Sequence, residues 1–175
     1  MNDARYPIGR YIPVDPLSHD DRRRAIDQIA LCPDELRRAL GGLSTAQLET
    51  PYRDGGWTVR QVAHHLPDSH MNAYVRHKLA VTEDSPTIRP YQEARWAELT
   101  DGREGDVEIS LKLLEALHDR WVRFLSGLEA EQFERTFLHP ATGKSWTLSQ
   151  SVAMYAWHGR HHVAHIDTLR ERMGW

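Results

Sequence analysis

Two histidines, His158 and His162, stand four residues apart in a segment that contains four of the chain's 11 histidines, residues 154–166. On an α-helix, residues at this spacing lie on one face with their Cβ atoms about 5–6 Å apart. Tyr155 and Ile166 fall on or near the same stripe, so the two imidazoles face the apolar side of the helix. Because neutral imidazole is the commonest metal ligand in proteins, the pattern points to a divalent metal ion.

The spacing alone leaves a plainer interpretation open. A His-x-x-x-His pair is frequent by chance, and a buried histidine is often satisfied by a hydrogen bond to a carbonyl or a side chain. A metal site therefore requires a third ligand from elsewhere in the chain.

The segment from Trp57 to about Thr82 supplies a candidate. Its apolar positions form one helical stripe, made of Val62, Leu66, Ala73 and Ala80. A polar stripe runs beside it and consists of Gln61, His65, Asp68, Asn72 and, at its edge, Arg76. Such short polar side chains at the boundary of a buried face favour a lined cavity, although a solvated helix surface is the competing interpretation.

If the two histidine-bearing helices face each other, His65 can join His158 and His162 on one ion. Three imidazoles leave a fourth coordination position open for water or substrate, which is the pattern of a catalytic zinc site. Structural zinc sites are usually closed and rich in cysteine, so the donor set favours a catalytic ion.

The remaining polar residues of the stripe have candidate roles around such an ion. Asp68 could orient a ligand imidazole or accept a proton. Asn72 and Arg76 could hold a polar or anionic part of a substrate. A solvated or structurally hydrogen-bonded polar edge explains these three residues equally well.

Composition excludes several other functions. The chain has 175 residues, 40% hydrophobic content and a net charge of −3, which predicts one soluble globular domain and gives no sign of nucleic-acid binding. No apolar run approaches the ~20 residues of a membrane span, and residues 1–7 lack the apolar core of a signal peptide. The single cysteine, Cys32, excludes an intrachain disulfide and favours a cytoplasmic location. We interpret it as a small packing residue.

The elements that must position these residues are helical. Long helices are predicted over residues 18–40, 58–82, 106–128 and 148–172, and shorter helical turns at 45–48, 91–99 and 131–135. Residues 136–139 and 144–147 suggest a hairpin, residues 100–105 a loop, and residues 1–17 an extended proline-rich arm. Pro33 should kink the first helix, and Pro67 should kink the second or delay its start. Four long helices with apolar faces predict an all-α four-helix bundle.

The motifs resemble a known family. Residues 54–65 read Asp-Gly-Gly-Trp-Thr-Val-Arg-Gln-Val-Ala-His-His, and residues 68–72 read Asp-Ser-His-Met-Asn. Together with the histidine-rich segment at 157–165, with residues 6–9 and 88–91, and with the ending Arg-Met-Gly-Trp, they resemble the YfiT-type metal-dependent hydrolases of the DinB superfamily. The resemblance covers nearly the whole chain.

The resemblance implies a DinB-like four-helix bundle, a cytoplasmic homodimer and one divalent ion, zinc or nickel, per subunit. The family's ligands fall on His65, His158 and His162. The neighbouring histidines are then not ligands; they are His64, His161 and His165.

The resemblance leaves the reaction open. The family label implies hydrolysis, whereas some superfamily relatives resemble thiol S-transferases that use the metal to activate a low-molecular-weight thiol such as bacillithiol. The resemblance to the superfamily slightly favours thiol transfer, but the open metal position suits either reaction. The rival hypotheses are a non-catalytic, metal-binding dimeric bundle and a plain bundle whose core histidines are satisfied by hydrogen bonds.

Overall fold

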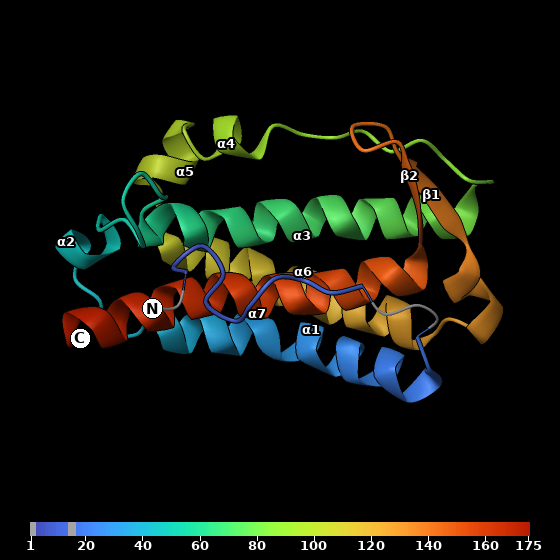
Figure 1. The fold of residues 1–175 in the computed structure, drawn as a ribbon, viewed down its shortest axis with the longest axis horizontal. Helices are drawn as coiled ribbons and strands as arrows, with labels where there is room; N and C mark the ends of the chain where they lie inside the picture. The colour runs from blue at the N-terminus through green and yellow to red at the C-terminus, as the bar shows by residue number, and fades with distance from the viewer. Residues whose placement is uncertain (1–2, 14–16) are drawn as a thin grey trace.

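The computed structural model describes residues 3–13 and 17–175 and is dominated by four long helices (Figure 1). These are α1 (His19–Leu40), α3 (Val59–Thr82), α6 (Val107–Ser126) and α7 (Leu148–Met173). The shorter elements are α2 (Thr45–Leu48), α4 (Glu93–Trp96), α5 (Thr100–Glu104), the 3₁₀ helix η1 (Ala130–Glu134) and an antiparallel hairpin of β1 (Thr136–His139) and β2 (Lys144–Thr147). The four long helices form the predicted bundle, and the predicted hairpin is present.

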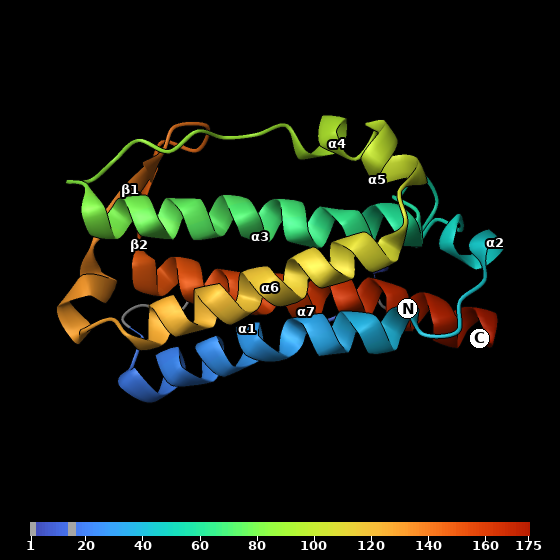
Figure 2. The same ribbon diagram turned by 180° about the vertical axis from the view of Figure 1, so that it is seen from behind.

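The bundle has two pairs of parallel helices. Helices α1 and α7 pack side by side and run in the same direction, and α3 and α6 form the other parallel pair (Figures 1 and 2). The parallel arrangement of α3 and α6 requires a crossover, and residues 83–106 supply it by returning along the outside of α3. Within the described residues, no helix is long and apolar enough to cross a membrane.

The core fills the space between the four helices. The apolar stripe predicted on α3 is fully buried, with Val62, Leu66, Ala73 and Ala80 each 0% exposed. Each of the other long helices contributes large buried side chains, including Leu36, Trp121 and Ile166. Burial of these side chains fixes how each helix is rotated about its axis, and so fixes which side chains face the neighbouring helix.

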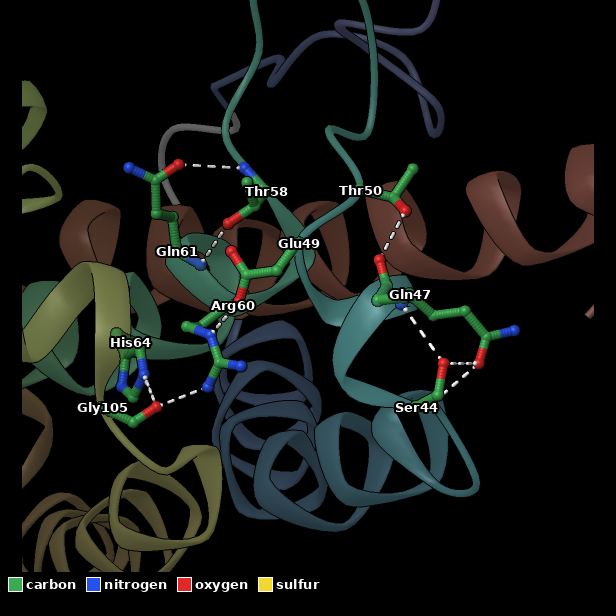
Figure 3. A network of polar contacts seen from close by, with 10 residues as sticks. Ser44, Gln47, Glu49, Thr50, Thr58, Arg60, Gln61, His64 and Gly105 are labelled. Atoms are coloured by element: carbon green, nitrogen blue, oxygen red, sulfur yellow. Dashed lines mark hydrogen bonds and ion pairs between the residues drawn. The ribbon is translucent and has the colours of Figure 1, made fainter.

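Both histidine-bearing helices begin with a capping box. Thr58 accepts a hydrogen bond from the backbone N–H of Gln61, whose side chain accepts one from the backbone N–H of Thr58 (Figure 3). Thr147 and Gln150 make the same pair of bonds at the start of α7. Each box satisfies backbone donors that the first helical turn leaves free. Ser18 caps α1 and Ser44 caps α2, each by accepting a hydrogen bond from a backbone N–H in the first turn.

Some boundaries differ from the sequence-based predictions. Helices α1 and α3 both continue through their internal prolines, Pro33 and Pro67, so α3 is not delayed. The predicted helix at 91–99 is reduced to α4, and the predicted loop at 100–105 contains α5. Tertiary contacts explain this difference, because the amide of Gln61 donates to the carbonyl of Ala97 and holds the crossover against α3.

The proline-rich arm lies on its own chain, against α7 (Figure 1). The imidazole Nε2 of His165 is 3.3 Å from the carbonyl oxygen of Arg5. The ring of Tyr11 lies 5.8 Å from the ring of Trp157. Residues 1–2 and 14–16 of the predicted arm lie outside the described residues.

Candidate metal centre

Helices α3 and α7 bring three imidazoles together. Each of His65, His158 and His162 offers one ring nitrogen, and these three atoms lie within 4.8 Å of one another. The Nε2 atoms of His65 and His158 are 3.4 Å apart. The ring of His162 lies 4.7 Å from that of His65 and 4.5 Å from that of His158.

The spacing fits a single tetrahedral ion. Zinc–imidazole bonds of about 2.0–2.1 Å at a tetrahedral angle place two ligand nitrogens about 3.3–3.4 Å apart. The distance between Nε2 of His65 and Nε2 of His158, 3.4 Å, agrees with this value. His65 is buried, whereas His158 keeps partial exposure. The residues present therefore suit a three-histidine ion with one further position.

Burial keeps these imidazoles uncharged. It lowers the pKa of His65 to about 4, with a smaller contribution from nearby His165. Burial also lowers the pKa values of His158 and His162 well below the usual range, and the neighbouring histidines add to the effect. The neutral imidazole is the form that binds a metal, so the side chains have lone pairs available at neutral pH.

Three further histidines lie close to these in the sequence but make other contacts. The Nδ1 of His64 lies 2.7 Å from the hydroxyl of Ser110, and its Nε2 lies 3.1 Å from the carbonyl oxygen of Gly105 (Figure 3). His161 stacks on Trp157 with ring centroids 4.3 Å apart, and His165 contacts the arm. All three are neighbours of the cluster.

The polar stripe on α3 divides into two groups. Burial raises the pKa of the Asp68 carboxyl to about 6, and the charge of Asp101 on α5 adds to this effect. The amide of Asn72 donates to the backbone carbonyl of Asp68 at 2.8 Å. Among the described residues, no hydrogen bond joins the Asp68 carboxylate to a histidine of the cluster. Asp68 lies near Asp101 of the crossover and Asn72 lines a cleft with crossover residues, so both lie at the edge of α3 that faces the crossover.

Arg76 lies deeper and has no acidic partner among the described residues. It is 9% exposed, and its Nη1 donates to the hydroxyl of Tyr155 at 3.3 Å. Its Nη2 donates to the carbonyl of Arg89 at 3.4 Å, while its Nε is buried without a partner. A buried guanidinium with a free donor suits an anionic or strongly polar group.

Sequence reasoning assigned no functional role to two tyrosines in this region, Tyr155 and Tyr91. Tyr155 stands one turn before His158 on α7, and their rings lie 5.5 Å apart. The hydroxyl of Tyr91 is buried and has no hydrogen-bond partner in the described part of the chain. Tyr91 also lines a cleft of about 570 Å³ together with residues from α3, α4 and the crossover; they are Asn72, Arg89, Pro90, Gln92, Arg95, Trp96 and Leu99. The sequence contained one clue to these residues, because Tyr155 lies on the same helical stripe as His158 and His162.

A second group of potential ligands lies behind the first. Cys32, His70 and His118 bring one ligand atom each within 4.8 Å of one another. His70 and His118 are hydrogen-bonded to each other, with Nδ1 of His70 2.8 Å from Nε2 of His118. Burial raises the pKa of the Cys32 thiol to about 12, so the sulfur stays protonated. This buried thiol is a packing group, as its sequence context suggested.

Comparison with known proteins places the chain in a family. A protein named "Putative metal-dependent hydrolase" from Bacillus cereus strain 03BB102 is 53% identical over the full length of both chains, and so is a protein of the same description from Bacillus thuringiensis subsp. konkukian strain 97-27. The fold matches the structure of YfiT from Bacillus subtilis, described as a probable metal-dependent hydrolase with an unusual four-helix bundle topology. The TM-score is 0.96 and the identity 48%, over 98% of each chain.

The family model described as the DinB superfamily matches residues 28–166, which include all three histidines of the cluster. The four-helix bundle and the clustered histidines agree with this match. The chain therefore belongs to the DinB superfamily.

Proposed function

We propose that this protein is a metal-dependent hydrolase in which His65, His158 and His162 hold one divalent ion, zinc or nickel. The convergence of three neutral imidazoles from α3 and α7 carries the proposal. A fourth position left free by three protein ligands is typical of catalytic rather than structural sites. The 53% identical relatives are named as metal-dependent hydrolases, which supports hydrolysis as the reaction.

The chain's own residues supply binding and proton transfer. A divalent ion contributes a lowered pKa for a bound water and stabilisation of developing negative charge. The buried guanidinium of Arg76, with the hydroxyls of Tyr155 and Tyr91, holds an anionic or polar part of the substrate. Asp68, with its pKa raised to about 6, is ionised at neutral pH and is the candidate proton acceptor.

Thiol S-transfer is the second candidate, and one observation favours it. Arg89 and Arg95 line the cleft beside Asn72, and Arg76, one turn after Asn72 on α3, donates to the carbonyl of Arg89. Low-molecular-weight thiols such as bacillithiol carry carboxylates, which arginines bind well. The same ion could deprotonate the thiol.

One set of assays separates the candidates. The metal-loaded protein is incubated with ester and amide panels, and separately with a low-molecular-weight thiol and an electrophile. Hydrolysis predicts cleavage without thiol consumption, and transfer predicts the reverse. His158→Ala and chelator-treated protein are the controls, and activity equal to theirs in both assays would leave the non-catalytic metal-binding bundle as the better description.

The resemblance to the family also leads us to propose a cytoplasmic homodimer. Sedimentation of the purified protein tests the assembly, and a mass of one chain at micromolar concentration would contradict it.

A further inference from the structure

A row of buried imidazoles leads away from the cluster. The Nδ1 of His158 lies 3.1 Å from Nε2 of His70. The Nδ1 of His70 lies 2.8 Å from Nε2 of His118 on α6, and Nδ1 of His118 lies 2.6 Å from the backbone carbonyl oxygen of Ile29 on α1. The row therefore joins all four long helices.

The last acceptor sets the direction of every bond. A carbonyl oxygen can only accept, so Nδ1 of His118 carries the proton. His70 is 0% exposed and His118 is 2% exposed, and the hydrogen bonds of both rings go only to other imidazoles and to the carbonyl of Ile29, so nothing stabilises a second proton and each ring has one. The Nε2 of His118 must then accept from Nδ1 of His70. By the same reasoning, Nε2 of His70 accepts from Nδ1 of His158.

The carbonyl of Ile29 has no helical hydrogen-bond donor, because the residue that would donate to it is a proline. In an α-helix, the carbonyl of residue 29 would accept from the backbone N–H of residue 33. Residue 33 is Pro33, which has no N–H, and α1 nevertheless continues past it. The proline therefore leaves the carbonyl of Ile29 without its helical partner, and His118 takes that place.

We infer that His70 and His118 are positioning residues, which form a one-directional hydrogen-bond relay from His158 to the carbonyl of Ile29. The relay fixes His158 in the tautomer whose Nε2 lone pair faces His65 and His162. Its use for metal binding rests on the proposed function above. Metal-ligating histidines usually donate their other ring N–H to a fixed acceptor, and here two further imidazoles carry that role to a backbone carbonyl.

A second ion at Cys32, His70 and His118 is the rival interpretation. An ion between Nδ1 of His70 and Nε2 of His118 would replace the hydrogen bond, yet these atoms are only 2.8 Å apart. Two tetrahedral ligands need about 3.3–3.4 Å between them. The structure therefore favours a proton between the two rings.

The first experiment reads the tautomers directly in the metal-free, full-length protein. Histidine labelled with ¹⁵N distinguishes Nδ1–H from Nε2–H through long-range proton–nitrogen correlations. We expect His158, His70 and His118 all to carry their proton on Nδ1 at neutral pH. An Nε2–H tautomer on any of the three would overturn the relay. This readout does not depend on whether the protein binds metal.

The second experiment measures zinc affinity by competition with a chelator. His118→Leu removes both bonds and should weaken binding by about 10–100-fold. His118→Gln can still accept from His70 and donate to Ile29, so it should recover most of that loss. His77→Leu is the matched control, because His77 is equally buried on α3 but bonds to Ser151 and Trp121.

The outcomes separate the relay from the proposed function. Wild-type affinity in a folded His118→Leu protein would reject the positioning role. If the wild type binds two zinc ions per chain and Cys32→Ala loses one of them, the relay is rejected in favour of a second metal site. Predicted tautomers in a wild-type protein that binds no metal would preserve the relay and reject the metal-dependent function. If His118→Leu does not fold, the tautomers of the wild-type protein and the zinc affinity of the His118→Gln variant still test the relay.

Discussion

The Nε2 atoms of His65 and His158 lie 3.4 Å apart, although the two residues are separated by 93 positions in the sequence. Desolvation lowers the pKa values of both rings, so a charged imidazole is disfavoured at either position. Two lone pairs at this distance repel each other, so a proton or a cation between them is needed to stabilise the arrangement. A divalent ion with a third ligand from His162 meets that need.

Metal content is the direct test of this arrangement. We expect about one ion per chain in the purified protein and loss of most of it in His65→Ala, His158→Ala and His162→Ala, because two imidazoles alone bind weakly. Elemental analysis after dialysis measures it. Zinc at about 100 times its dissociation constant should also stabilise the folded wild type by about 2.7 kcal/mol, seen as a raised melting temperature.

His161→Ala is the matched control for metal loss. His161 adjoins His162 in the sequence but stacks on Trp157. This variant should retain its ion. Equal metal content in the wild type and the His158→Ala variant would contradict the site.

The fold was largely predictable because its signals are local. Each element is set by residues close together in the sequence. Examples are the helical repeat of apolar residues, the side chains that cap α1 and α3 at Ser18 and Thr58, and the paired segments of the hairpin. The predicted ends of the long helices and the strands are therefore nearly correct. The prolines could not show more than a missing N–H, because the sequence does not say which group will bond to the carbonyl that is left without its helical donor. Only tertiary structure places His118 against Ile29.

The site was predictable in part. Helical spacing placed His158 and His162 on one face, the polar stripe offered His65 as a third ligand, and the family resemblance selected the same three residues. Neither spacing nor resemblance identified His70, because its partners come from α6 and α7 and its sequence context is an ordinary buried helix position. The sequence also did not predict the position of Tyr91, because the path of the crossover along the outside of α3 places it in a cleft with Asn72.

The buried histidines predict a destabilised protein in mild acid. Their folded-state pKa values lie below that of an unfolded histidine, about 6.5; His65 and His118 are at about 4 and His77 at about 3. The unfolded chain therefore binds more protons between these values. Stability is complete above pH 6.5 and falls as pH drops toward 4, by about 1.4 kcal/mol per pH unit for each such group.

Urea unfolding of the chelator-treated protein at pH 7.5, 6, 5 and 4 measures this dependence. Asp68 has the opposite effect on stability, because its raised carboxyl pKa makes the folded state bind an extra proton between about pH 4 and 6. A single carboxyl offsets only part of the effect of several histidines. His77→Gln should flatten the profile. His19→Gln is the control, since the His19 side chain is 81% exposed. A profile that is level from pH 7.5 to 5 would reject the assignment of neutral buried imidazoles.

Arg76 should determine selectivity for charged substrates. Arg76→Gln removes the charge of the buried guanidinium, and loss of a hydrogen bond to a charged group costs about 1.5–3 kcal/mol. We expect KM for a carboxylate-bearing substrate to rise about 10–100-fold, with little change for its neutral methyl ester and with unchanged metal content. Arg76→Lys should recover part of the loss. The same KM increase for both substrates would show that Arg76 shapes the site without binding an anion.

Gly159 lets α7 approach α1 beside the cluster. A Cβ at this position would lie 2.8 Å from the sulfur of Cys32 and 3.5 Å from the ring of His70. Gly159→Ala should therefore destabilise the protein by about 1–3 kcal/mol through overpacking, even though alanine favours a helix. Adding Cys32→Ala removes the sulfur and should restore part of this loss, with a coupling of about 0.5–3 kcal/mol in a urea double-mutant cycle. Additive effects would mean that the strain falls on His70 instead, and zinc affinity of the single variant would then fall in parallel.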